Sequence, residues 1–384
     1  MFITDSVKYI GVDDTTIDLF ESQYVVPEGI SYNSYVILDE KIAVMDTVDD
    51  RGQEGWLQNL TEVLSGRSVD YLIVNHAEPD HSGSIAKLAE LYPKITVVGN
   101  AKTFQFIQQF YNIDKLNTLV VKEGDTLSLG EHTLSFYMAP MVHWPEVMVT
   151  YDSKDKILFS ADGFGKFGAL QYETEDWACE ARRYYFNIVG KYGAPVQSLL
   201  KKAAGLDIAI ICPLHGPVLS ENLDYYINLY NTWSGYTPED KGVLVAYASI
   251  HGNTRQAAEK FAEMLRERGE EKVVVSDLAR EDMAEVIEDA FRYDRMVLAA
   301  ASYDAGVFPC MLDFLHHLQS KAYQKRSVGI IENGSWAPSA AKTMKPILES
   351  MKEITILEPT VTIKSTLKEE NMDALNALAD AVCK

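Results

Sequence analysis

The strongest constraint on the fold is the regular alternation of apolar runs and amphipathic segments in residues 241–384. Strand-like runs GVLVAYAS, EKVVVSDL, RMVLAAAS, SVGIIEN and ITILEPTVTI are separated by helical patterns that include 255–268, 311–319 and 340–352. Parallel neighbouring strands need a crossover connection, which a helix usually provides. The alternation therefore predicts an α/β domain with a doubly wound, five-stranded parallel sheet covered by helices on both faces.

The first 240 residues follow a different pattern. Short strand-like runs such as SYVILDE, KIAVMDTVD, HTLSFYMAP and KILFSAD alternate with helical segments, which predicts a sandwich of sheets flanked by helices. The segment 234–242 is polar, rich in turn residues and without periodicity, as expected of a linker. We therefore expect two domains, residues 1–240 and residues 241–384.

Charge and composition exclude several classes of protein. The net charge of −21 disfavours nucleic acid and anionic lipid as partners, because an acidic surface repels both. The sequence start lacks a signal-peptide pattern, and no apolar run approaches the roughly 18 residues that span a bilayer, so we expect a soluble cytoplasmic protein with no membrane partner. The four cysteines form no CxxC pair, so we expect reduced, buried thiols and no rubredoxin-type iron site.

A cluster of metal-binding residue types follows the apolar run YLIV, in the segment NHAEPDHSGS at residues 75–84. His76, Glu78, Asp80 and His81 leave the end of a predicted strand together, where loop side chains can converge on one point. The alternative is an ordinary helix start, with Asp80 or Ser82 as the capping residue and the histidines on the surface.

Three further residues at strand ends favour the metal interpretation. His143, Asp162 and His215 each follow a predicted strand, although each by itself is more often an ordinary polar residue. Together with the first cluster they supply seven donors, enough for two metal ions. Asp162 is the natural bridge because a carboxylate has two oxygens to share.

A second set of candidate residues lies after strands of the C-terminal half. The segment SIHGNT at 249–254 opens a predicted helix, where backbone N–H groups and hydroxyls can surround a phosphate, although an ordinary capped turn is the alternative. Two more loops follow strands on the same sheet edge. The segment SIHGNT resembles the flavodoxin phosphate loop, and this resemblance implies bound FMN, with Tyr303 and Trp336 beside its ring, although isolated aromatic residues more often serve packing. The FMN-binding residues predicted in this way are Ser249, His251, Gly252, Asn253, Thr254, Ser302, Tyr303, Asp304, Ala305, Gly306, Asn333, Gly334, Ser335 and Trp336.

These motifs resemble those of a known family. The pattern HxExDH followed by His, Asp and His is similar to the metallo-β-lactamase superfamily, but Glu78 stands where its zinc hydrolases usually carry a second histidine. This carboxylate variant, with a loop that resembles the flavodoxin pattern [ST]xxGNT, is typical of flavodiiron proteins. The resemblance implies an αββα metallo-β-lactamase-like domain and a flavodoxin-like domain. It also implies one iron held by His76, Glu78 and His143, a second held by Asp80, His81 and His215, and Asp162 as the bridge.

The same resemblance implies an oxidoreductase that reduces O2 to water, NO to N2O, or both, at two irons. Electrons would come through FMN from a separate donor such as rubredoxin or a reduced deazaflavin. A head-to-tail homodimer, or a dimer of dimers, would bring the flavin of one subunit near the irons of the other. The alternatives are a zinc hydrolase fused to a flavodoxin-like module and an electron carrier with a vestigial first domain. The added oxygen donor favours iron over zinc.

Overall fold

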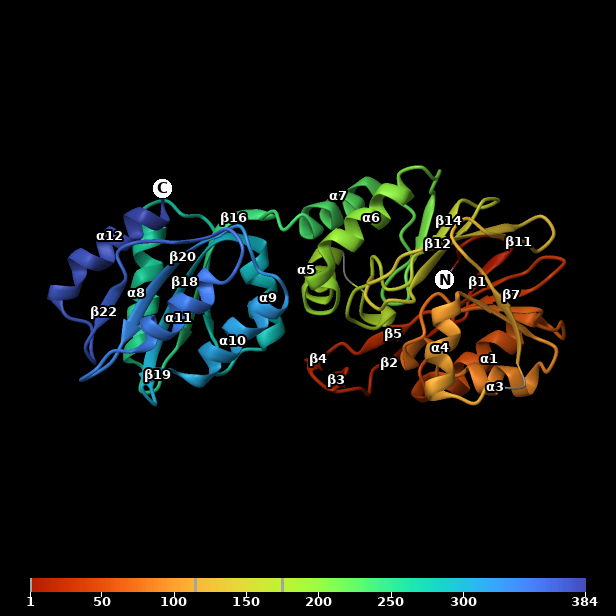
Figure 1. The fold of residues 1–384 in the computed structure, drawn as a ribbon, viewed down its shortest axis with the longest axis horizontal. Helices are drawn as coiled ribbons and strands as arrows, with labels where there is room; N and C mark the ends of the chain where they lie inside the picture. Colours follow the sequence, from red (N-terminus) through yellow and green to blue (C-terminus); the bar gives the residue numbers. More distant parts are fainter. Residues whose placement is uncertain (1, 114–115, 174–175) are drawn as a thin grey trace. The chain divides into compact units, whose positions relative to one another are not determined.

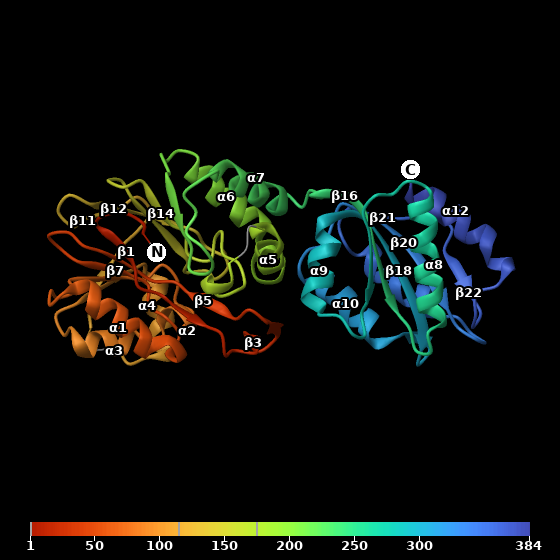
Figure 2. The same cartoon turned by 180° about the vertical axis from the view of Figure 1, so that it is seen from behind.

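The computed structural model describes residues 2–113, 116–173 and 176–384. The chain forms two compact units: Met1–Tyr185 with Tyr192–Asn231, and Phe186–Lys191 with Thr232–Lys384. Both are mixed α/β units (Figures 1 and 2). The division of the sequence after residue 240 stays a prediction.

The first unit contains two main sheets. One has six strands, in the order β1 (Val7–Tyr9), β6 (Tyr35–Ile37), β7 (Ala43–Met45), β8 (Tyr71–Ile73), β9 (Thr96–Gly99) and β10 (Asn117–Val120). The other has five, in the order β11 (Thr126–Ser128), β12 (Thr133–Met138), β13 (Met148–Asp152), β14 (Ile157–Phe159) and β15 (Ile210–Cys212). A small hairpin of β3 (Leu19–Phe20) and β4 (Tyr24–Val25) stands apart from both sheets.

Helices cover the outer faces of this sandwich, as the sequence pattern predicts. Figure 1 shows α1 (Gln53–Leu64), α3 (Ile85–Leu91) and α4 (Ala101–Phe110) beside the first sheet. It shows α6 (Gly193–Ala203) and α7 (Leu223–Ser234) beside the second, with α5 (Trp177–Tyr184) nearby. The core between the sheets is apolar: Ile37 and Met45 of the first sheet share one buried cluster with Phe136 and Phe159 of the second. Burial of such side chains, worth about 1.5–3 kcal/mol each, holds the two sheets together.

The second unit contains the predicted parallel sheet. Its strands lie in the order β17 (Val273–Asp277), β16 (Asp240–Ala248), β18 (Tyr293–Tyr303) and β20 (Arg326–Asn333). Both β21 (Ile354–Ile356) and β22 (Val361–Ile363) pair in parallel with β20, so the run expected to be one fifth strand is two short ones. The chain adds β19 (Gly306–Val307), antiparallel to β18.

Two groups of helices pack against this sheet. α8 (Asn253–Glu267) contacts α12 (Met372–Val382), whereas α10 (Pro309–Ser320) contacts α9 (Met283–Arg292) and α11 (Ala340–Glu349). Ala258 and Phe261 of α8 form a buried cluster with Val297 of β18 and Leu378 of α12. The sheet order, with β16 between β17 and β18, leaves the carboxyl ends of β16, β18 and β20 side by side, which is the edge where ligands bind in doubly wound sheets.

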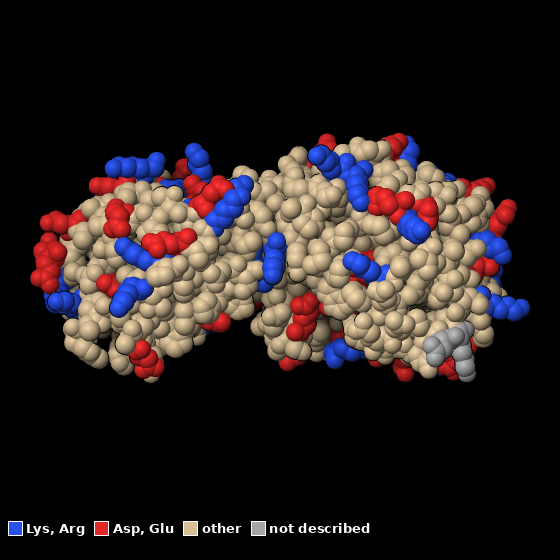
Figure 3. Space-filling model, viewed as in Figure 1, with Lys and Arg blue, Asp and Glu red and all other residues tan. Residues whose placement is uncertain are grey.

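The surface charges, the helix lengths and the burial of the cysteines can be compared with the expectations from the sequence. Acidic and basic side chains are interspersed on the face shown in Figure 3. No helix in the described part of the chain combines the length and the apolar character needed to cross a lipid bilayer. Cys212 is buried, whereas Cys179, Cys310 and Cys383 are only partly buried, so the expectation of burial is wrong for these three.

Candidate functional site

The segment that contains His76 and Glu78 leaves the end of β8 and turns at once into a short helix. This helix, α2 (Pro79–Ser82), has Glu78 at its N-cap position and Pro79 at its first position, where a missing N–H costs nothing. His76 and His81 are fully buried, so the alternative that places the histidines on the surface is wrong. A helix does start here, but Glu78 rather than Asp80 or Ser82 is its N-cap residue, and Asp80 and His81 lie within its single turn.

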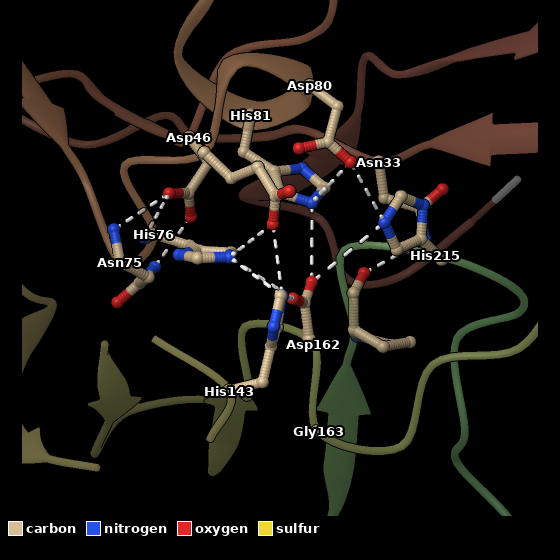
Figure 4. Close-up of polar contacts among 12 residues, drawn as sticks. Asn33, Asp46, Asn75, His76, Asp80, His81, His143, Asp162, Gly163 and His215 are labelled. Atoms are coloured by element: carbon tan, nitrogen blue, oxygen red, sulfur yellow. Dashed lines mark hydrogen bonds and ion pairs between the residues drawn. The ribbon is translucent and has the colours of Figure 1, made fainter. Parts of the chain in front are cut away.

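Four of the predicted ligands form a first cluster. His76 Nε2 lies 3.1 Å and His143 Nε2 lies 3.0 Å from the same oxygen of Glu78, Oε2. Asp162 Oδ2 lies 3.3 Å from His76 Nε2 and 3.1 Å from His143 Nε2. Three segments distant in sequence, which carry His76 with Glu78, His143 and Asp162, therefore bring their donor atoms together (Figure 4).

The other three predicted ligands form a second cluster beside the first. Asp80 Oδ2 lies 3.2 Å from His81 Nε2 and 3.3 Å from His215 Nε2. The second oxygen of Asp162, Oδ1, lies 3.3 Å from His81 Nε2 and 3.9 Å from His215 Nε2. Asp162 therefore faces one cluster with each carboxylate oxygen, which is the arrangement of a bridging ligand (Figure 4).

The donor atoms behave as a site built for cations. Within the described residues, Asp80 Oδ1, Asp162 Oδ1, His215 Nε2 and both ring nitrogens of His81 are buried without a hydrogen-bond partner. Buried polar atoms without partners are rare in folded proteins and often mark a missing ion or water. His/carboxylate donor sets suit non-haem iron.

The pKa shifts of His143 and Asp162 also indicate a site that requires positive charge. Burial alone would lower the pKa of His143, but hydrogen bonds with Asp162 and Glu78 outweigh it and raise that pKa to about 9. Burial alone would raise the pKa of Asp162, but the charge of His76 and hydrogen bonds with neighbouring histidines hold it well below its usual range. Without metal, the pocket therefore takes up protons to supply the positive charge that its carboxylates require.

Two buried carboxylates that the sequence did not single out support the clusters. Asp46 Oδ1 accepts hydrogen bonds from the backbone N–H of Asn75 (2.7 Å) and of His76 (3.2 Å), so it fixes the start of the ligand loop. Glu146 Oε1 accepts from Ala77 N (2.9 Å) and lies 2.8 Å from His76 Nδ1. Neither residue belongs to a motif that identifies it in the sequence.

The loop that carries Asp162 is stabilised by contacts between Phe164 and Tyr230. Phe164, two residues further on, has a φ of +67°, which is unusual for a bulky side chain. Its backbone N–H donates to the hydroxyl of Tyr230 at 2.6 Å, and its ring stacks on the Tyr230 ring with centroids 4.2 Å apart. Tyr230 therefore fixes the backbone next to the candidate bridging ligand.

The β3–β4 hairpin adds residues near the clusters that sequence analysis also missed. The ring of Phe20 lies edge-on to the ring of His215, with centroids 5.3 Å apart. Glu21 follows in the turn, and desolvation together with the nearby charge of Glu78 raises the pKa of Glu21 to about 7.

Trp144, next to His143 in sequence and outside this hairpin, places its ring edge-on to the ring of His76, with centroids 5.4 Å apart.

The first predicted FMN loop leads directly into the N-terminus of α8. Gly252 adopts a φ of +88° at the N-cap of α8, a conformation that glycine adopts without strain. Its N–H donates to Ser249 Oγ at 3.1 Å, and Thr254 is buried in the first turn of the helix. His251 lies exposed within the same loop.

The other two loops lie at the ends of β18 and β20. Ser302 Oγ accepts hydrogen bonds from the backbone N–H groups of Ser339 (2.8 Å) and Ala340 (3.3 Å), so it ties the second loop to the start of α11. Tyr303 and Gly306 pair across a hairpin whose turn contains Asp304 and Ala305.

A further loop that sequence analysis missed supports the third one. The side chain of Asn333 donates to the carbonyl of Ser365 (2.8 Å) and accepts from its N–H (3.0 Å), while Ser365 Oγ donates to Ser335 Oγ (2.8 Å). Gly334 donates to Ile363. The ring of Trp336 is 91% exposed and available for contact with a ligand.

Comparisons with known proteins agree with this geometry. Residues 30–216 match the family model described as "ODP family beta lactamase". The chain is 29% identical to an uncharacterized protein from Methanocaldococcus jannaschii, an alignment that covers 96% of this chain and 94% of the relative. It is 27% identical to the anaerobic nitric oxide reductase flavorubredoxin of Escherichia coli, over 90% of this chain and 74% of that protein.

Solved structures show the same similarity over both units. A flavodiiron protein from Giardia intestinalis matches with a TM-score of 0.89 and 26% identity, covering 99% of this chain and 95% of that one. The rubredoxin oxygen:oxidoreductase of Desulfovibrio gigas matches in fold, with a TM-score of 0.93, 24% identity, and 99% and 97% of the two chains covered.

Proposed function

Because this chain belongs to the flavodiiron protein family, we propose that it is an oxidoreductase that reduces O2 to water, NO to N2O, or both. The observation that carries the proposal is the pair of clusters joined by Asp162, in which Glu78 supplies an oxygen donor to the first cluster. An added carboxylate favours a redox-active metal over the zinc of a hydrolase, since anionic oxygen donors stabilise higher oxidation states.

The assignment of ligands follows the two clusters. His76, Glu78 and His143 would hold one iron, and Asp80, His81 and His215 the other, with one oxygen of Asp162 on each. When bound, two irons supply Lewis acidity and electrons to a diatomic gas, and a reduced flavin supplies more electrons. The protein fixes the donor atoms, and Phe20 and Trp144 limit the space next to the histidine rings.

FMN is the second proposed cofactor. Its phosphate would lie at the N-terminus of α8, where Gly252 has no side chain to cover the backbone and where the N–H groups of a helix start favour an anion. The isoalloxazine ring would lie between the loops at 302–306 and 333–336, where Tyr303 and Trp336 are exposed. The hydrogen bonds of Ser302 and Asn333 hold these loops in place.

The electron donor and the assembly are further parts of the proposal. We propose a separate donor such as rubredoxin or a reduced deazaflavin, and a head-to-tail homodimer or a dimer of dimers. In such a dimer the flavin of one subunit approaches the irons of the other. Light scattering on the purified holoprotein tests the assembly, and a monomer with full activity would contradict it.

The function is tested by metal and flavin analysis of the purified protein, followed by turnover with each gas. We expect about two irons and one FMN per chain, and consumption of O2 or NO when reduced rubredoxin is supplied. A parallel assay with a reduced deazaflavin distinguishes the two donors. A protein with stoichiometric zinc, no iron and no consumption of either gas would refute the proposal.

A further inference from the structure

Glu146 is a buried carboxylate beside the candidate metal centre that has no place in the ligand set. The residue is 1% exposed and precedes β13. Its Oε1 accepts a hydrogen bond from Ala77 N and lies 2.8 Å from His76 Nδ1, whereas its Oε2 is buried without a hydrogen-bond partner in the described part of the chain. Burial of a carboxylate is costly unless positive charge or N–H donors compensate for it, so its retention here requires an explanation.

The contact determines the orientation and the tautomer of His76. Nε2 of this ring faces Glu78, Asp162 and His143, so the proton of a neutral ring lies on Nδ1 and is donated to Glu146. A carboxylate that accepts this proton makes the opposite nitrogen a stronger electron donor to a metal.

Two of the other predicted ligand histidines, His81 and His215, have no carboxylate at Nδ1 within the described residues. His215 Nδ1 faces the neutral carbonyl oxygen of Ser31 at 2.7 Å. His81 Nδ1 is buried with no hydrogen-bond partner within the described residues. Of these three rings, only that of His76 is backed by a negative charge.

Charge balance gives Glu146 a second effect. The predicted ligands include three carboxylates, so two divalent irons leave one positive charge in excess and two trivalent irons leave three. A further buried negative charge stabilises the trivalent state more than the divalent state, because Coulomb energy scales with the charge it faces. Glu146 should therefore lower the reduction potential of the centre as well as strengthen metal binding.

We propose that Glu146 is a positioning residue for the metal centre: its carboxylate holds His76 with Nε2 directed at the metal, and its charge strengthens metal binding and favours the oxidised state. The inference rests on the proposed function only for the identity of the metal. The contact itself is independent of which gas is reduced.

The chain offers a matched control. His132 and Asp152 form another buried carboxylate–histidine pair in the same unit, with Nδ1 and Oδ2 2.9 Å apart, and neither residue is a predicted ligand. The variants Glu146→Gln and Asp152→Asn each remove one buried negative charge next to an imidazole. Only the first removes it from a residue of the two clusters joined by Asp162, because His132 and Asp152 belong to a separate group of possible donors with Asp155.

The experiment measures Co²⁺ binding to the metal-free full-length protein by the visible absorption of the bound ion, and the midpoint potential of the iron-loaded protein. We expect Glu146→Gln to bind Co²⁺ about 10–100-fold more weakly, the usual effect of losing such a partner, with a shifted absorption band and a raised potential. Asp152→Asn should leave affinity, band and potential unchanged. Glu146→Asp restores the charge on a shorter side chain and should recover part of the affinity.

Each outcome decides the inference. Unchanged Co²⁺ affinity and spectrum in Glu146→Gln would overturn it, and so would equal losses in Glu146→Gln and Asp152→Asn. If Glu146→Gln does not fold, the Glu146→Asp variant decides. The proposal would be contradicted if Glu146→Asp kept the wild-type Co²⁺ affinity, absorption band and midpoint potential while Asp152→Asn lost them. If wild-type protein consumes neither gas but the Co²⁺ difference holds, the proposed function fails and the role of Glu146 stands.

Discussion

Replacement of Tyr230 by phenylalanine tests whether the backbone near Asp162 is held by one hydrogen bond. The hydroxyl of Tyr230 accepts the N–H of Phe164 at 2.6 Å in a fully buried setting, and the substitution keeps the stacked rings. A buried N–H that loses its partner costs about 1–3 kcal/mol. The strained φ of Phe164, +67°, adds a tendency for the loop to relax once the bond is gone.

This loss should appear in two measurements. In domains of about 150–250 residues, 1 kcal/mol corresponds to about 2–4 °C, so we expect the melting temperature of the first unit in Tyr230→Phe to fall by about 2–12 °C. Because Asp162 lies two residues from Phe164, metal affinity should also fall. Thermal unfolding by circular dichroism and Co²⁺ titration measure the two effects, with Tyr172→Phe at an exposed ring as the control. Unchanged stability and unchanged affinity in Tyr230→Phe would show that the bond does not hold the loop.

Three further substitutions test other parts of the two sites. His143→Ala should reduce bound iron and abolish gas reduction, whereas His317→Ala on α10 should do neither. Iron analysis and gas-consumption assays of both variants check this. Gly252→Ala should weaken FMN binding, because the φ of +88° at this position costs a residue with a side chain about 1–2 kcal/mol. Quenching of FMN fluorescence measures the affinity. Equal affinity in the variant and the wild type would contradict the phosphate assignment. Desolvation by nearby protein atoms and the charge of Glu78 raise the pKa of the exposed Glu21 from 4.5 to about 7, so the metal-free folded state binds a proton that the unfolded state releases. Its stability should therefore fall as pH rises from about 4.5 to 7, and Glu21→Gln should flatten this slope in urea unfolding; an unchanged slope would show that another group is responsible.

The fold could be predicted from the sequence because strands and helices have local signals, and the predicted ligands do lie together in the structure, while their binding of metal stays a prediction. Apolar runs mark strands, and His143, Asp162 and His215 lie in the loops that follow β12, β14 and β15, so the sandwich brings them together. The family resemblance supplied their grouping into two sets, which the geometry reproduces.

The supporting residues could not be found in the same way. Glu146 reaches His76 across 70 positions of the chain, and the contact depends on how the two sheets pack. Ser365 supports Asn333 from a loop that has no motif of its own. The single fifth strand was wrong because the run ITILEPTVTI breaks at Pro359, which lacks an N–H for a sheet hydrogen bond.

The candidate ligands of each cofactor all come from one compact unit. Every predicted iron ligand lies at or before residue 215, and every predicted flavin contact lies at or after residue 249. Neither cofactor is therefore required to shape the other's binding loops. A cell short of iron would accumulate yellow, inactive chains that still carry their flavin and that regain activity once the metal returns.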